Sequence, residues 1–188
     1  MPAVGGAAVS LPSGYGHARP KSRQVLQVSA VPFEESYVGS LRKYVGAQRI
    51  ITPGPRAVIV NDSGDVLLVR RSDDNTWVMP AGGLELGESI WDALVREVLE
   101  ETGLVVEAAT PIALYTGPQY WFTNAYGAHH QMFAVVFRVD RWSGSLRTET
   151  DETRDARFFS RSDLPPLRDV YRETLADLDA FDGTLILK

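Results

Sequence analysis

Three glutamates, Glu97, Glu100 and Glu101, lie within one turn of a helix that the sequence predicts over residues 89–102. At about 100° per residue, Glu97 and Glu101 fall on the same arc as the apolar residues of this helix, the side that should face the protein. Carboxylates that share an inward face repel one another, and partial burial raises that cost. The C-terminal end of a helix also carries partial negative charge, which disfavours further anions there.

A divalent cation would resolve this conflict. Hard oxygen ligands at this density suit Mg²⁺, with Mn²⁺ as the alternative, and water completes the coordination shell. The simpler interpretation is a solvated charged face, in which Arg96 and Glu100 form an i,i+4 ion pair of only about 0.3–0.5 kcal/mol. That interpretation accounts for Asp92, on the far side of the helix, but not for two acids on the inward arc.

Glycines precede the acidic helix. Gly82 and Gly83 let the backbone approach a ligand closely, and Gly87 permits a tight bend just before the helix. The segment lacks the Gly-Lys-Ser/Thr ending of a phosphate-binding P-loop. Turn chemistry alone would explain isolated glycines. Here the loop returns the chain beside the acids, so a backbone carbonyl is available to the same metal.

The acidity of the chain is local. The formal net charge is −5 over 188 residues, and residues 80–104, with six acids and one arginine, account for all of it. A general nucleic-acid surface is disfavoured because phosphate binding needs a basic face. There is no cysteine, which excludes a thiol nucleophile, disulfides and a cysteine-based zinc site.

Residues 1–33, rich in Gly, Ala, Pro and Ser, predict a flexible N-terminal tail with a short ordered piece at Val25–Val31. Residues 34–188 then form one domain. We find no apolar run of membrane length, and glycines and a proline interrupt any signal-peptide core. The expected compartment is the cytoplasm.

The local patterns predict helices at 34–45, 89–102 and 166–181, with Ser89 as N-cap and Gly103 as the stop of the second. They also predict a hairpin that turns at Asn61–Gly64, an extended piece at 77–79, a loop at 116–129, and strands at about 104–115, 131–139 and 156–160. This order indicates an α/β or α+β domain with a mixed sheet between helices.

Gly82, Glu88, the run from Arg96 to Glu101, and Gly103 together resemble the signature of the Nudix hydrolases. The flanking segments resemble MutT-type members of that family from about Arg56 to Leu167. The resemblance implies an α/β/α sandwich with a central mixed sheet. It also implies metal-dependent hydrolysis of a diphosphate bond in a nucleoside diphosphate linked to another moiety, such as a nucleoside triphosphate or a nucleotide sugar.

Carried over by position, the resemblance implies that Glu97, Glu100 and Glu101 ligate the metal, together with the carbonyl of Ala81, where many relatives have glycine. Glu97 would also act as the base.

In the same way, Arg96 would orient these acids and Glu88 would support the junction of loop and helix. Relatives often supply one more acid from outside the signature. Asp151 and Glu152 are the candidates, and Glu152 is preferred. An exposed turn acid with no role is an equal alternative.

Substrate contacts are predicted from two groups of residues. Arg56 and Arg70, with Arg71 beside them, are placed to meet phosphates; the alternative is solvated charges at strand ends. The aromatic loop residues could stack on a base or sugar, or simply pack beneath the loop: Tyr120, Trp121, Phe122 and Tyr126. His129 and His130 are weaker candidates. In the family, a proline downstream of the signature marks ADP-ribose hydrolysis and a tyrosine near it marks hydrolysis of diadenosine polyphosphates. Pro118 and Tyr120 lie close to both positions, so they do not separate the two subfamilies.

Other functions stay open at this point. A regulator that binds nucleotides without catalysis would use the same fold, but such a protein is expected to lose acids, and none is lost here. A structural protein with a charged helix does not explain the spacing. Relatives often form homodimers, and the helix at 34–45 offers a surface for one.

Overall fold

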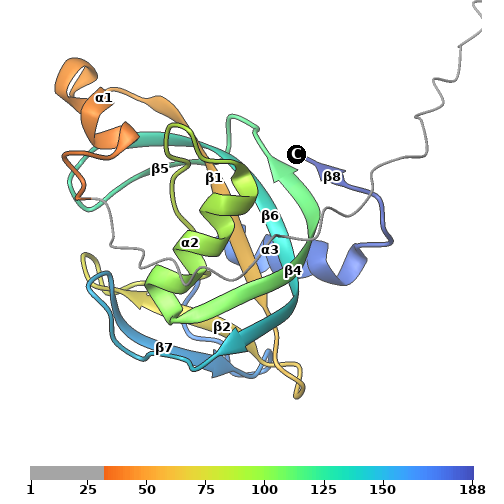
Figure 1. Cartoon of the computed structure of the whole chain (residues 1–188). Coiled ribbons are helices and arrows are strands. Elements are labelled where there is room, and N and C mark those ends of the chain that lie inside the picture. The colour runs from red at the N-terminus through yellow and green to blue at the C-terminus, as the bar shows by residue number, and fades with distance from the viewer. Residues whose placement is uncertain (1–31) are drawn as a thin grey trace, which may run out of the picture.

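The computed structural model describes residues 32–188, so the predicted tail, including the ordered piece at Val25–Val31, lies almost entirely outside the described residues. In chain order the elements are α1 Tyr37–Val45, β1 Ile50–Ile59, β2 Val66–Arg71, β3 Trp77–Val78, α2 Ile90–Thr102, β4 Leu104–Tyr115, β5 Trp121–Thr123, β6 His129–Gly144, β7 Thr153–Phe159, α3 Asp169–Ala180 and β8 Ile186–Leu187 (Figure 1).

The strands form two sheets. A mixed sheet has the order β1-β6-β4-β8, with β5 added to β6, and a smaller antiparallel sheet has the order β3-β2-β7. Helix α2 lies on one side of the mixed sheet and α3 on the other (Figure 1). The predicted α+β sandwich with a mixed central sheet is therefore confirmed.

The predicted hairpin is wrong in its pairing. The turn itself is present: the side chain of Asn61 accepts hydrogen bonds from the backbone N–H groups of Ser63 and Asp65, and Gly64 has φ 82°. Beyond one bridge between Val60 and Val66, however, the two strands separate into different sheets. Instead, β1 pairs in parallel with β6 and β2 pairs with β7, each along its whole length. These ladders hold more backbone hydrogen bonds than the single bridge beside the turn.

Other boundaries differ from the prediction at the ends of elements. The predicted loop at 116–129 contains the short strand β5, which pairs with the start of β6. β6 continues five residues beyond the predicted end at Val139, and β8 was not predicted. These segments become strands because they pair with distant strands, and the local sequence pattern does not show which strands will pair.

Helix α2 begins and ends where its caps predict. The Ser89 side chain accepts from the backbone N–H of Asp92, and the Asp92 carboxylate accepts from the backbone N–H of Ser89, which forms a capping box. Gly103 has φ 73° and ends the helix in the left-handed conformation. The caps fix where the helix stops, and with it the position of the three glutamates in its last turn.

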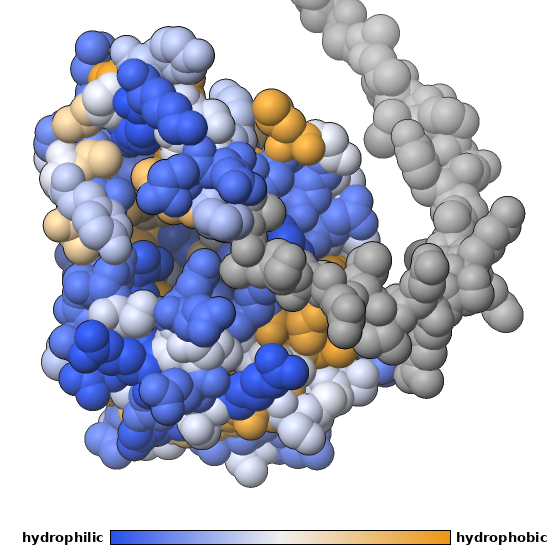
Figure 2. All heavy atoms as spheres, turned by 60° about the vertical axis from the view of Figure 1, so that its left-hand side comes forward, coloured by the Kyte–Doolittle hydropathy of each residue, from blue (hydrophilic) through white to orange (hydrophobic). Residues whose placement is uncertain are grey.

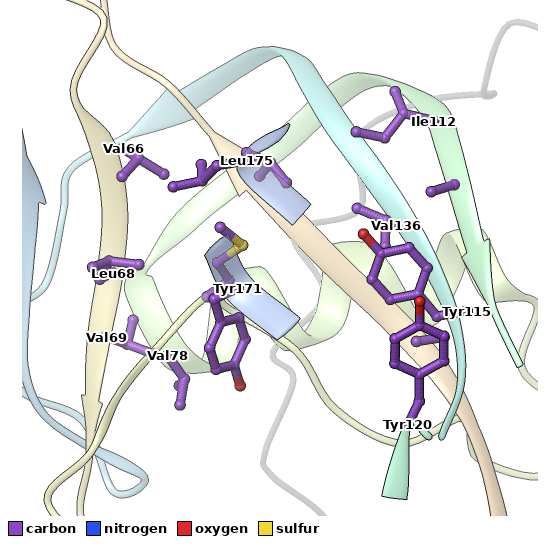
Figure 3. Close-up of a cluster of buried hydrophobic side chains, with 14 of the residues drawn as sticks. Val66, Leu68, Val69, Val78, Ile112, Tyr115, Tyr120, Val136, Tyr171 and Leu175 are labelled. Carbon is purple, nitrogen blue, oxygen red and sulfur yellow. The ribbon is translucent and has the colours of Figure 1, made fainter. Parts of the chain in front are cut away.

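Two apolar clusters hold the layers together. One, on the α2 side, joins Leu94 and Val98 to strands β1, β4 and β6. The other joins Tyr171 and Leu175 of α3 to the opposite side, with Tyr115 and Tyr120 stacked at one edge (Figure 3). Of the described helices, none is both long enough and apolar enough to cross a bilayer.

Candidate active site

A cavity of about 400 Å³ opens beside the N-terminal end of β1. Its walls come from α1, β1, the loop between β3 and α2, the last turn of α2, the β5–β6 region and the start of α3. Figure 2 shows a hollow in this face, with hydrophilic residues around its mouth. The cavity therefore collects residues from nearly the whole length of the described chain.

The glutamates of α2 form one end of this cavity. Glu97 and Glu101 are buried, with 7% and 4% of their surface exposed, and Glu100 is half-buried. The helical wheel placed Glu97 and Glu101 on the inward arc, and that is where they lie.

Arg96 is the centre of the polar contacts at this end. Its Nη1 donates to Glu97 Oε1 at 2.8 Å and to Glu100 Oε2 at 3.0 Å. Its Nε and Nη2 donate to the two oxygens of Glu88, at 2.7 and 3.0 Å, and Nη2 also donates to the carbonyl of Gly83 at 2.9 Å. One guanidinium thus ties the glycine loop to the helix and orients two of the acids.

The loop backbone fits closely around the acids. The N–H of Ala81 donates to Glu101 Oε2 at 3.0 Å. A Cβ on Gly82 would lie 1.9–2.2 Å from the carboxylate of Glu97, so only glycine fits there. Gly83 faces open space, and a side chain there would meet nothing within 4 Å. Of these two glycines, Gly82 is the one that the site requires.

The environment of these acids favours their neutral form. Burial raises the pKa of Glu97 to about 7, against the opposing effect of Arg96. Burial, together with the charge of Glu97, raises the pKa of Glu101 well above its usual value. Burial also raises the pKa of Glu100. Three neighbouring carboxyl groups with raised pKa values are a site where a cation would be stabilising.

The donor set fits a hard divalent ion. Glu100 Oε1 is buried and has no hydrogen-bond partner, which leaves one oxygen free for a ligand. Between residues 32 and 188 no three acidic or histidine side chains already surround one point. Arg96 and the Ala81 N–H occupy oxygens of all three glutamates. An ion such as Mg²⁺, which keeps several waters, would therefore bind through some of these carboxylates and complete its shell with water and substrate oxygens.

Of the two acids outside the helix, only Glu152 lines the cavity. Its charge contributes to the raised pKa values of Glu97, Glu100 and Glu101. Its backbone carbonyl accepts from the N–H of Ser72, which holds the loop before β7 beside the end of β2. Asp151 does not line the cavity.

The arginines predicted to meet phosphates do not all reach the cavity. Arg70 and Arg71 are neighbours on β2, so their side chains point to opposite sides of the strand. Arg70 is exposed, donates to the carbonyl of Asn75 and does not line the cavity, so that candidate is not brought to the site. Arg71 points the other way and lines the cavity, bonded to Asp73 at 2.6 Å. Arg56 lines it as well and is buried rather than solvated.

Three of the four aromatic loop residues lie outside the cavity. Tyr120 is buried in the core, stacked on Tyr115 with its hydroxyl bonded to Glu173. Trp121 and Tyr126 are 47% and 80% exposed and do not line the cavity. Strand β5 alternates its side chains, and its pairing with β6 turns only Phe122 toward the cavity.

His130 lines the cavity beside Phe122, with the two rings stacked at 5.0 Å. The Asn124 side-chain oxygen accepts from the backbone N–H groups of Tyr126 and Ala128, so its Nδ2 faces His130. Nε2 of His130 therefore lies between two donors, Arg42 Nη2 and Asn124 Nδ2, and must act as acceptor. Burial and the charge of Arg42 lower the pKa of His130 to about 4, so the ring is neutral with its proton on Nδ1.

Several residues of the cavity were not predicted. Asn124, Arg168 and Tyr171 line it from β5–β6 and from the start of α3. Nothing in their local sequence marks them, although the alternation of β6 would have placed His130, Met132 and Ala134 on one face. Helix α1 joins the wall too: the N–H of Tyr37 donates to Glu85 Oε2 at 2.6 Å, which ties the helix to the glycine loop.

The comparisons with known proteins agree with this geometry. A model of the NUDIX domain matches residues 51–178. An ADP-ribose pyrophosphatase of Methanocaldococcus jannaschii is 27% identical over 63% of this chain and 68% of its own. An RNA pyrophosphohydrolase of Roseobacter denitrificans is 32% identical over 68% of this chain and 89% of its own. The crystal structure of a MutT NUDIX hydrolase from Burkholderia pseudomallei is 30% identical, covers 69% of this chain and 98% of its own, and superposes with a TM-score of 0.56. The chain therefore belongs to the Nudix family, as a hydrolase of MutT type that acts on pyrophosphate bonds.

Proposed function

We propose that this chain hydrolyses, with Mg²⁺ or Mn²⁺, a diphosphate bond in a nucleoside diphosphate that is linked to another moiety. The observation that carries the proposal is the pair of buried glutamates, Glu97 and Glu101, packed against the backbone of Gly82 and Ala81 at one end of the cavity. A divalent cation would stabilise these buried acids as carboxylates and would bind the free oxygen of Glu100, and the same cation would neutralise a diphosphate.

The metal would be held by Glu97, Glu100 and Glu101, with the carbonyl of Ala81 as a further ligand. When bound, it supplies neutralisation of the diphosphate charge and makes the attacking water more acidic.

The chain's own groups do the rest. Arg96 holds Glu97 by its Oε1, which leaves Oε2 to take the proton of the attacking water. Glu88 fixes Arg96, and the Ala81 N–H fixes Glu101. Glu152, on the facing loop, is the acid from outside the helix that would act with them.

The nucleotide would occupy the rest of the cavity. Phe122 and the neutral His130 give it an aromatic wall, and Arg56 and Arg71 line it as cations. Arg70, Tyr120, Trp121 and Tyr126 have no part in this proposal, since their side chains lie elsewhere. The homodimer through α1 stays a prediction, to be checked by light scattering.

The test is a substrate panel with Mg²⁺ and with Mn²⁺: nucleoside di- and triphosphates, nucleotide sugars, ADP-ribose, dinucleoside polyphosphates and 5′-triphosphorylated RNA. Wild type is compared with Glu101→Gln, which keeps the size of the side chain and removes its charge. We expect release of phosphate or mononucleotide that disappears in Glu101→Gln. The matched control, Glu149→Gln, makes the same change at an exposed glutamate that does not line the cavity, and it should leave turnover intact.

The alternative is a regulator that binds nucleotides without hydrolysing them. Nucleotide binding by wild type with no turnover of any substrate would establish it. Turnover that survives in Glu101→Gln would contradict the assignment of the metal ligands.

A further inference from the structure

Four arginines line the cavity, and one of them differs from the rest. Three have a carboxylate partner within 3.4 Å: Arg71 with Asp73, Arg96 with Glu88, Glu97 and Glu100, and Arg168 with Asp74. Arg56 has no carboxylate partner anywhere in residues 32–188, although it is the most buried of the four, with 3% of its surface exposed. A buried charge is normally paired, because an unpaired one is costly to remove from water.

The contacts that Arg56 does make are to neutral groups. Nη1 donates to the Thr174 hydroxyl at 3.0 Å, and Nη2 lies 3.2 Å from the Met132 sulfur, a weak acceptor. Its guanidinium lies 4.9 and 5.6 Å from the ring centres of Tyr171 and Tyr115. Nε is buried without any partner. These contacts position the guanidinium but do not neutralise it.

The carboxylate whose charge does reach Arg56 is already engaged. Glu173 accepts from the Tyr120 hydroxyl at 3.0 Å and from Lys188 Nζ at 2.7 Å. Burial lowers the pKa of Arg56. This direction agrees with a buried guanidinium that has no carboxylate beside it.

The fold does not need the charge of Arg56. The Thr174 hydroxyl donates to the Val170 carbonyl at 2.8 Å, so it keeps a partner without Arg56. The Met132 sulfur and the tyrosine rings need no hydrogen bond. An apolar side chain of similar length would therefore leave no polar group of these neighbours without a partner.

We propose that Arg56 binds an oxyanion, a phosphate or a carboxylate, on the part of the substrate that is not held by the glutamates of α2. This rests on the proposed function, because it assumes that the diphosphate occupies the acidic end. A guanidinium is planar and can bond both oxygens of such a group, and the apolar wall of Val78, Met132 and Ala134 excludes water that would screen the pair. The substrates are then nucleoside diphosphates that carry a second charged group, rather than those that end in a neutral sugar.

The first experiment measures binding of inorganic phosphate by calorimetry in EDTA. Without metal, the acidic end holds no cation that could attract phosphate, so binding reports the arginines of the cavity alone. We expect wild type to bind phosphate and Arg56→Met to bind it about tenfold more weakly or not at all. Arg70→Met, an exposed arginine of β2 outside the cavity, is the matched control and should bind like wild type.

The second experiment uses pairs of substrates that differ in one anionic group. NADP⁺ against NAD⁺ tests a phosphate, and UDP-glucuronate against UDP-glucose tests a carboxylate. In wild type we expect kcat/KM to favour the charged member of at least one pair by about tenfold, and the favoured pair identifies the anion. In Arg56→Met this preference should fall to about one.

Wild type that does not bind phosphate in EDTA would overturn the proposal, as would phosphate binding that Arg56→Met leaves unchanged. If Arg56→Met does not fold, the wild-type preference decides alone, and equal kcat/KM within both pairs overturns the proposal. Phosphate binding that persists while no diphosphate is hydrolysed would instead contradict the proposed function and leave the anion site standing.

Discussion

The two ends of the cavity are built in opposite ways. At the acidic end, Glu97, Glu100 and Glu101 come from one turn of one helix. Arg96 holds Glu97 and Glu100, and the backbone N–H of Ala81 holds Glu101. At the other end, Arg56 on β1, Phe122 on β5, His130 on β6 and Tyr171 on α3 meet from four elements. The first end is set by local geometry and the second by the tertiary fold.

This difference indicates how the two ends respond to change. The acidic end is close-packed, with a backbone that touches the carboxylate of Glu97, so small displacements reach the reacting groups. The other end is a wall of separate side chains, where a change alters affinity more than chemistry. Substitutions at the acidic end should therefore change the rate or the stability strongly, and substitutions at the other end should mainly change affinity.

Substituting Gly82 by alanine should be the most damaging change. Its Cβ would lie 1.9–2.2 Å from the carboxylate of Glu97, which must then move. A displacement of about 1 Å in a reacting group costs on the order of 10²-fold in rate, so we expect kcat to fall by about that factor. Gly83→Ala adds a Cβ in open space and should stay within about twofold of wild type. Equal effects of the two substitutions would contradict the close fit.

Replacing Arg96 by lysine keeps the charge but removes the planar fork. One ammonium cannot reach Glu88, Glu97, Glu100 and the carbonyl of Gly83 together. We expect the free energy of unfolding in EDTA to fall by about 2–3 kcal/mol, measured by urea titration. Arg141→Lys, which alters an exposed pair with Glu107, is the control and should cost no more than about 0.5 kcal/mol. A loss of that smaller size for Arg96→Lys would mean that the network is solvated.

His130 should give the metal-free protein a pH dependence at the other end of the cavity. Its pKa in the folded protein is about 4, below the usual 6.5, because burial and Arg42 disfavour its charged form. Between these values the unfolded chain binds more protons, so the free energy of unfolding should fall as pH falls from 6.5 to 4, by about 1–2 kcal/mol after solvent screening. In His130→Gln this part of the slope should vanish. Identical slopes for the two proteins would show that His130 titrates normally.

The aromatic residues provide the smallest contrast. Phe122 lines the cavity, whereas Tyr126, four residues on, is 80% exposed and outside it. We expect Phe122→Ala to raise KM about three- to tenfold with kcat nearly unchanged, and Tyr126→Ala to leave both within about twofold. A larger effect from Tyr126 would mean that the loop closes over the substrate.

The acidic end could be predicted from sequence because its information is local. The spacing of Glu97 and Glu101 and the caps Ser89 and Gly103 together determine which way the carboxylates point. The three layers also followed from the order of strands and helices. The same reasoning gave the wrong pairing for β1 and β2. The local sequence predicts the turn between these strands, but it does not predict that each strand pairs with a distant one.

At the other end the sequence named Arg56, Phe122 and His130 as candidates, but it could not show which candidates lie together, because these residues are far apart in sequence. Thr174 lies 118 positions from Arg56, the residue whose guanidinium it bonds. The aromatic loop was recognised, but its members were not separated. That separation depends on the pairing of β5 with β6, which places Tyr120 in the core and Phe122 at the cavity while Trp121 faces outward. Once the pairing of a strand is known, alternation shows which of its side chains face the cavity. Without the pairing, it does not.

The bond from the Tyr37 N–H to Glu85 makes one amide a reporter for the loop that carries Gly82 and Gly83. Glu85 lies in that loop, so any rearrangement that withdraws its carboxylate leaves this amide open to solvent. The hydrogen-exchange rate of Tyr37, followed by NMR as Mg²⁺ and then nucleotide are added, would separate loop movement on metal binding from loop movement on substrate binding. The order of metal binding and loop movement can thus be measured at Tyr37, which lies 48 residues before Glu85 in the chain. No probe has to be placed in the site itself.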